Sequence, residues 1–111
     1  MKRACWLLGL LVIACGPEVQ VKIRTDPNTN RVVEEYPYYL ENGQTVKHGY
    51  YRSFYPDGSP KETGEYAHGL KEGEWVYRQD DIKRVGIFAD DRLVGLYKYY
   101  DSSDRKIREG T

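Results

Sequence analysis

Apolar and polar residues alternate along the chain from Glu18 onward. The clearest run covers residues 18–25, where Val19, Val21 and Ile23 occupy one side of an extended segment and the polar residues between them occupy the other. Further alternating runs follow, and no window carries apolar residues at the three-to-four spacing of a helix for long enough to predict one. The pattern therefore predicts an all-β chain of about eight short strands.

Turn residues separate these runs at intervals of about ten to fifteen residues. The turn segments are residues 26–28, 42–43, 56–58, 68–69, 80–81, 90–91 and 101–104. Asn-Gly and Asp-Gly pairs among them supply the positive φ angles of tight hairpins. We therefore expect consecutive strands to pair as hairpins in a single-layer antiparallel meander.

The first residues follow a different pattern. Lys2 and Arg3 precede an uncharged, mostly apolar run of eleven residues at positions 4–14. A membrane-spanning helix needs about 20 residues, so the run is too short for a permanent span, but it fits the apolar centre of a secretory signal. The segment could be a simple cleaved signal, or a buried strand that contains a cysteine by chance. The residues at its end favour a third, more specific interpretation.

The run ends in Val12-Ile13-Ala14-Cys15, which resembles the lipobox of bacterial lipoproteins. The resemblance implies that residues 1–14 are a signal peptide, that Cys15 becomes the acylated N-terminus, and that residues 15–17 are the lipidated cysteine and a short tether. Acyl chains would bind membrane lipid stably, since each buried methylene contributes about 0.8 kcal/mol. Gly16, in place of Asp, resembles an outer-membrane address. We therefore expect a lipid-anchored protein of the cell envelope, on the outer membrane in a Gram-negative bacterium.

Cleavage would remove Cys5 and leave Cys15 as the only cysteine. The mature domain, residues 18–111, would then contain no disulfide and no cysteine-based metal site, so its fold would depend on packing alone. From Cys15 to Glu18 the chain can span only about 10 Å, at roughly 3.4 Å per residue. We expect the domain to lie close to the bilayer surface.

The chain also repeats itself. Three units begin at Gly49, Gly73 and Gly95, which are 24 and 22 residues apart. Each unit places an aromatic residue two positions after its glycine, and the first two continue through a turn to a second glycine–x–aromatic segment and another turn. The recurrence resembles the short variant of the MORN repeat found in bacterial proteins, over roughly residues 36–110.

This resemblance implies stacked hairpins whose equivalent rings form a ladder across the sheet. Tyr51 and Tyr97 stand where the family pattern has Trp, and aspartate pairs replace the expected glycine turns at 80–81 and 90–91. An isolated hairpin is marginal in water, so the units should depend on one another through their rings. We expect Gly49 and its equivalents to bend the backbone or to let it pass close to a ring. Some proteins with similar repeats are labelled antitoxin-like, a label that an export signal does not favour.

The rings also supply the candidate ligand or partner surface. Its residues are Tyr51, Trp75, Tyr77, Tyr97 and Tyr99. These rings could stack on sugars or on a partner peptide, or they could be the core packing that the repeat requires. A partly exposed ladder could serve both purposes.

Charge and motif content limit the remaining possibilities. The chain has 17 basic and 17 acidic residues and a formal net charge of zero, which excludes a bulk electrostatic grip on nucleic acid. No nucleophile elbow, phosphate-binding glycine loop or zinc-protease motif is present. The aspartates at 80–81 and 90–91 are typical of polar turns, and His48 and His68 are typical of solvated histidines beside turn glycines.

The sequence therefore predicts a non-enzymatic protein without metal or cofactor. Its expected partners are membrane lipid, through Cys15, and an unknown envelope protein, through the sheet. A glycan- or peptidoglycan-binding module with an exposed aromatic ladder is the alternative, and an enzyme with an unrecognised site is a third hypothesis. The sequence does not indicate an oligomeric state.

Overall fold

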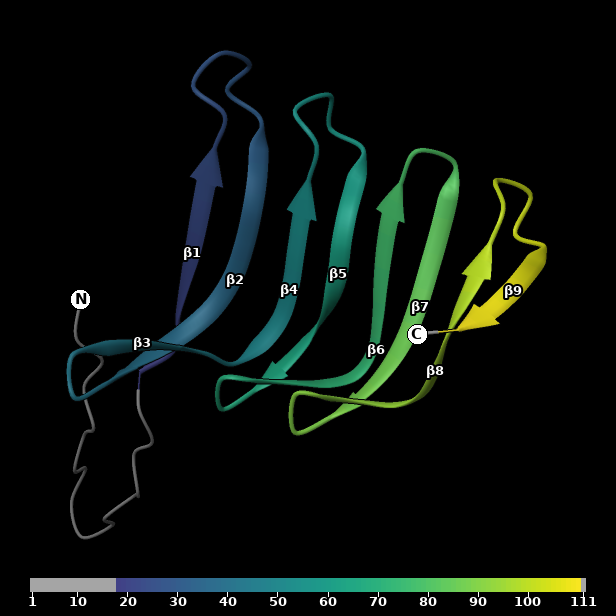
Figure 1. Cartoon of the computed structure of the whole chain (residues 1–111). Coiled ribbons are helices and arrows are strands. Elements are labelled where there is room, and N and C mark those ends of the chain that lie inside the picture. Colours follow the sequence, from purple (N-terminus) through teal and green to yellow (C-terminus); the bar gives the residue numbers. More distant parts are fainter. Residues whose placement is uncertain (1–17, 111) are drawn as a thin grey trace, which may run out of the picture.

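The computed structural model describes residues 18–110, which form one open antiparallel sheet. Its strands are β1 (Gln20–Thr25), β2 (Val32–Glu41), β3 (Gln44–Lys47), β4 (Gly49–Phe54), β5 (Pro60–Ala67), β6 (Leu70–Gln79), β7 (Ile82–Ala89), β8 (Arg92–Tyr100) and β9 (Lys106–Gly110). Eight of them follow one another in the order β1-β2-β4-β5-β6-β7-β8-β9, and β3 pairs with β2 outside this path. Figure 1 shows the resulting single layer. The predicted all-β, single-layer meander is confirmed.

Apart from β3 and β4, which are joined at His48, consecutive strands are joined at the predicted turn segments. At residues 42–43, 68–69 and 90–91, both turn residues have positive φ, which is the backbone of a two-residue hairpin turn. Asp90 and Asp91 adopt φ angles of 50° and 71°, so this aspartate pair makes the same kind of turn as Asn42 and Gly43. The glycine turns of the repeat can therefore be replaced by aspartates without loss of the hairpin.

Strands β6 and β8 bend where they pass a glycine of the preceding strand. On one stretch of the β5–β6 pair, β5 contributes only Gly64, whereas β6 contributes residues 73–75. The β7–β8 pair repeats this arrangement, with Gly86 opposite residues 95–97. The first extra residue of each strand is a glycine with a positive φ, +73° in β6 and +81° in β8. The repeat glycines therefore bend the strands, and Figure 1 shows the lower ends of these hairpins turned away from the upper strands.

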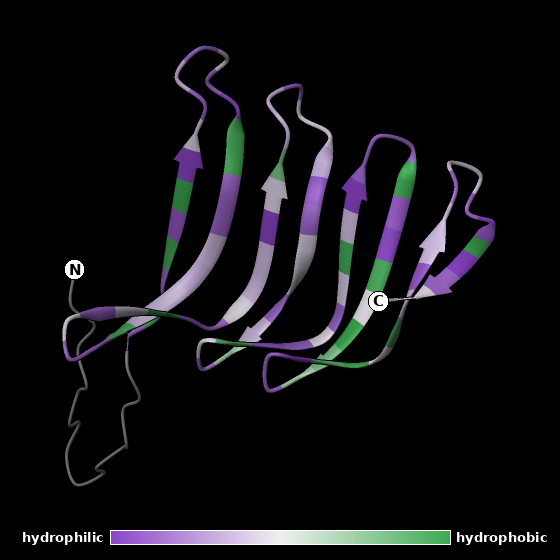
Figure 2. Cartoon of the chain, viewed as in Figure 1, coloured by the Kyte–Doolittle hydropathy of each residue, from purple (hydrophilic) through white to green (hydrophobic). Residues whose placement is uncertain are grey.

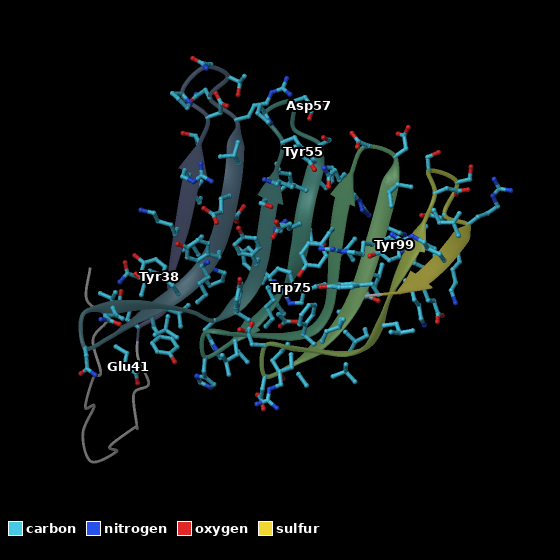
Figure 3. All side chains as sticks on the ribbon, in the orientation of Figure 1. Tyr38, Glu41, Tyr55, Asp57, Trp75 and Tyr99 are labelled. Carbon is cyan, nitrogen blue, oxygen red and sulfur yellow. The ribbon has the colours of Figure 1, made fainter. Side chains whose placement is uncertain are left out.

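The core lies on one side of the sheet, next to the bends of β6 and β8. Tyr51, Trp75 and Phe88 form its buried centre, and Trp75 has no exposed surface. Partly buried side chains surround them, namely Tyr36, Tyr66, Tyr77, Leu93 and Tyr97. Figure 3 shows Trp75 near the middle of the sheet, with Tyr99 toward its β8 side. Aromatic packing within one layer thus replaces the second layer that most sheets need.

The apolar side of β1 does not belong to this core. Val19, Val21 and Ile23 are each about half exposed (51–53%), and Figure 2 shows the alternation of apolar and polar residues along β1. The polar side of the strand faces the rings instead, because Lys22 is opposite Tyr36 in the register of β1 and β2. The alternating pattern therefore located the strand correctly, but its apolar side is turned to solvent.

Candidate functional site

The predicted surface residues all lie on one side of the sheet, which we call the aromatic face. This face carries Tyr36, Tyr51, Tyr66, Trp75, Tyr77, Phe88, Tyr97 and Tyr99. The five predicted residues are among them and form a connected row. The successive ring-centre distances are 5.6 Å for Tyr51–Trp75, 6.1 Å for Trp75–Tyr77, 6.3 Å for Tyr77–Tyr97 and 6.4 Å for Tyr97–Tyr99. Tyr36, which the sequence did not single out, extends the row by stacking on Tyr51 at 5.9 Å.

Burial divides this row into two kinds of ring. Trp75 is completely covered, and its indole Nε1 donates a hydrogen bond of 3.0 Å to the Glu65 carbonyl. Tyr51 and Tyr99 retain only 9% exposure each, whereas Tyr77 and Tyr97 are half-buried. Trp75 therefore packs the sheet and cannot touch a ligand, so Tyr77 and Tyr97 are the two of the five predicted rings that expose the most surface for contact with a ligand.

Two glycines of the preceding strands receive the central rings. A Cβ atom on Gly64 would lie 2.1 Å from the Trp75 ring, and one on Gly86 would lie 2.7 Å from the Tyr97 ring. The rings thus rest directly on bare backbone. The first glycine of each unit was expected to bend the backbone or to let it pass close to a ring, and at Gly73 and Gly95 the bend is what the structure shows, because a Cβ there would meet nothing within 4 Å. Gly73 and Gly95 therefore bend their strands, whereas Gly64 and Gly86 accept the rings of the following unit.

A long side chain two residues before each repeat glycine covers the rings from outside. The Lys47 Nζ lies 4.9 to 5.4 Å from the centres of three tyrosine rings. The Lys71 Nζ lies 4.8 Å from the Trp75 ring centre and donates a hydrogen bond of 2.9 Å to the Tyr77 hydroxyl. Leu93 occupies the equivalent position in the third unit and packs on the core. Aligning the units two residues upstream of each glycine would have identified this set.

Tyr51 and Glu34 form a polar pair at the edge of the rings. The Tyr51 hydroxyl donates a hydrogen bond of 2.6 Å to Glu34. Burial, followed by this hydrogen bond, raises the pKa of Tyr51 far above its ordinary value. Burial opposes ionisation of Glu34, but hydrogen bonds from Tyr51 and Arg24, together with the charges of Arg24 and Lys47, hold its pKa below the ordinary value. The pair therefore consists of a neutral phenol and a carboxylate at neutral pH.

Two hollows flank the row of rings. The lower one, about 790 Å³, lies beside Lys47 and Lys71 and reaches the turn at His68 and Gly69. The upper one, about 470 Å³, is lined by Tyr55, Lys61, Glu62, Tyr77, Arg78, Gln79, Asp80, Ile82, Arg84 and Tyr99. We call the upper hollow the Arg84 cleft. Both are open to solvent along the aromatic face.

The two histidines lie together against a tyrosine, whereas the two aspartate pairs lie apart. The rings of His48 and His68 lie 4.4 Å apart, and the Tyr39 hydroxyl lies 3.0 Å from Nδ1 of His68. The aspartate pairs do not come together, since the turns at 80–81 and 90–91 lie at opposite ends of β7. Within residues 18–110, no three His, Cys, Asp or Glu side chains gather as a metal site.

The signal segment 1–14, Cys15 and the tether 15–17 lie outside the described residues, so the predicted anchor remains a prediction. Across the described part of the chain, the structure contains no helix that is long and apolar enough to cross a membrane. Searches of protein-family models, curated proteins and solved structures found no match to the chain.

Proposed function

We propose that this chain is a lipid-anchored, non-enzymatic protein-interaction module of the cell envelope, built from MORN-variant repeats. The proposal is supported by two separable features. The lipobox-like segment ending at Cys15 would supply the location. The repeat sheet would supply a rigid scaffold, because its rings are used to stabilise a single layer.

The observation that carries the scaffold role is the complete burial of Trp75 between neighbouring hairpins. A ring with no exposed surface serves stability, so a partner must bind the open edges and hollows around the row. The edge strand β1 provides one such surface, since Val21 and Ile23 remain half exposed. This strand begins a few residues after Cys15, so that surface would lie close to the membrane.

The anchor is tested by metabolic labelling with an acyl-chain probe in intact cells. The wild-type protein should carry the label and sediment with membranes, and Cys15→Ala should lose both properties. Cys5→Ala is the matched control, because that residue would leave with the signal and its replacement should change neither readout. An unlabelled wild-type protein in the soluble fraction would refute the proposal.

The partner is tested by crosslinking in intact cells followed by mass spectrometry. Specific crosslinks from the wild-type protein to one envelope protein, lost when Cys15→Ala removes the anchor, are expected. Recovery of the purified protein as a soluble catalyst would refute the role.

Glycan binding is the second candidate, and Tyr77 and Tyr97 are the rings that could support it. The burial of Trp75 and Tyr51 leaves little of the ladder free for stacking on sugars. Tryptophan fluorescence titrated with cell-wall fragments tests this candidate, since Tyr77 lies 6.1 Å from the Trp75 ring. An unchanged spectrum would count against it.

A further inference from the structure

Arg84 is held between two rings of the aromatic face. Its guanidinium carbon lies 4.4 Å from the ring centre of Tyr77 and 4.3 Å from that of Tyr97. Within residues 18–110, the Arg84 Nε is buried and has no hydrogen-bond partner, and no carboxylate lies within ion-pair distance of this side chain. A buried donor without a partner is costly, so a guanidinium held in this way is prepared to receive an acceptor.

The repeat itself does not require an arginine here. Arg84 pairs with Tyr99 across β7 and β8, and the equivalent positions facing Tyr77 and Ser53 in the earlier units carry Glu62 and Glu34. The first two units therefore place an acid where the third places a base. Glu34 accepts hydrogen bonds from Tyr51 and Arg24, whereas Arg84 has no such partner within the described sheet.

Glu62, an acid that lines the same cleft, forms no ion pair with Arg84. Glu62 and Arg84 are both in register with Tyr77, one on each side of β6, so the tyrosine stands between them. The charge of Glu62 acts on Tyr66 and Lys71. Arg84 thus keeps an uncompensated positive charge beside the aromatic rings.

The space beside Arg84 suits a side chain of a partner. The Arg84 cleft has a volume of about 470 Å³, within the range of about 300–1,000 Å³ that small ligands occupy. The residues that line it include three bases, Lys61, Arg78 and Arg84, and two acids, Glu62 and Asp80. The Tyr55 hydroxyl donates a hydrogen bond of 2.5 Å to the Arg78 carbonyl and ties the two rims of the cleft together.

We propose that the Arg84 cleft binds the carboxylate of an acidic side chain of a partner protein, with Arg84 as the planar, two-pronged donor. This inference rests on the proposed interaction role and names the chemistry of the contact. A peptide carboxylate is favoured over an acidic sugar because the guanidinium already covers the rings of Tyr77 and Tyr97, on which a sugar would stack.

The test uses the full chain in mild detergent and two short peptides. The probes are acetyl-Gly-Glu-Gly-Glu-Gly-amide and the same peptide with Gln in place of Glu, with glucuronate as a third ligand. Titrations follow the arginine Nε–H signals by NMR, and the Arg84 signal is assigned from its loss in Arg84→Gln. We expect the Glu peptide to shift this signal, to bind at least about tenfold more tightly than the Gln peptide, and to weaken as salt is added.

Variants separate a built site from general charge attraction. Arg84→Gln should weaken binding of the Glu peptide about tenfold or more, and Arg84→Lys should restore only part of it, because an ammonium lacks the two-pronged geometry. Arg78→Gln is the matched control, since this residue lines the same cleft, and it should change affinity less than about twofold. Circular dichroism checks that each variant remains folded.

Four results would overturn the inference. They are equal affinity for the two peptides, an unmoved Arg84 signal, an equal loss in Arg78→Gln, and binding of glucuronate alone. Cys15→Ala should bind the Glu peptide like the wild type, so failure of the anchor and failure of the cleft are distinguishable.

Discussion

The substitution Gly64→Ala tests the central packing element of this sheet. Gly64 has no side chain, and the Trp75 ring rests on it from the next strand. The added Cβ would lie 2.1 Å from the ring, whereas ordinary contact begins at 3.4 Å. The ring would have to move by about 1.3 Å, the difference between those two distances.

The surroundings of Trp75 give it little room for that movement. Its ring lies 5.0 Å from Tyr66 and 5.6 Å from Tyr51, and its Nε1 is hydrogen-bonded to the Glu65 carbonyl. Overpacking of a filled core costs about 1–3 kcal/mol. Where the new methyl group fits, Gly→Ala instead stabilises by about 0.4–1 kcal/mol through the unfolded chain. The sign of the change in the free energy of unfolding therefore shows whether the Trp75 ring packs directly on Gly64.

The assay is urea-induced unfolding of the full chain in mild detergent, followed by circular dichroism. Gly64→Ala should destabilise by about 1–3 kcal/mol. Gly86→Ala should cost less, because its Cβ would approach the half-buried Tyr97 at 2.7 Å. Gly110→Ala is the control, with a nearest contact of 3.4 Å, and it should change stability by less than about 0.5 kcal/mol. A neutral or stabilising Gly64→Ala would refute the packing argument.

The same measurement checks three further predictions. Lys71→Leu should preserve more stability than Lys71→Ala, because Leu93 already fills the equivalent position of the third unit; an equal loss would show that the charge, and not the covering stem, matters. Gly73→Ala should cost about 1–2 kcal/mol, because its φ of +73° disfavours a side chain; no loss would contradict a bend held by this φ. The raised pKa of Tyr51 means that the folded state keeps a proton that the unfolded state loses at about pH 10. Stability should therefore fall as the pH rises above about 10, and Tyr51→Phe should reduce that fall; an unchanged slope would exclude Tyr51 as its source.

The sequence predicted the hairpins because each turn carries its own local signal. Residues such as Asn42 and Gly43 favour positive φ whatever surrounds them, so the strand boundaries follow from the chain alone. The grouping of Tyr51, Trp75 and Tyr97 also followed from their equal place in each unit. Local signals and internal repetition thus determined the architecture.

Contacts between units were less predictable, because they depend on register. Trp75 packs on Gly64 because β6 has extra residues opposite this single residue of β5. No local sequence pattern shows how many residues of one strand will lie opposite one residue of the next. The unpaired Arg84 was missed for a related reason. A basic residue among scattered charges resembles any solvated side chain until the register places it between Tyr77 and Tyr97.

The orientation of β1 shows why alternation alone does not decide which side of a strand is buried. In a two-layer fold, the apolar side must face the second layer. In this single layer, the rings bury one another sideways, and the stems of lysine and arginine can cover them while their charges stay in water. Lys22 can therefore face Tyr36 while Val21 and Ile23 stay half exposed. That exposed apolar stripe occurs on an edge strand, where unpaired backbone also favours association, so β1 is the edge at which the sheet is best prepared to pair with another strand.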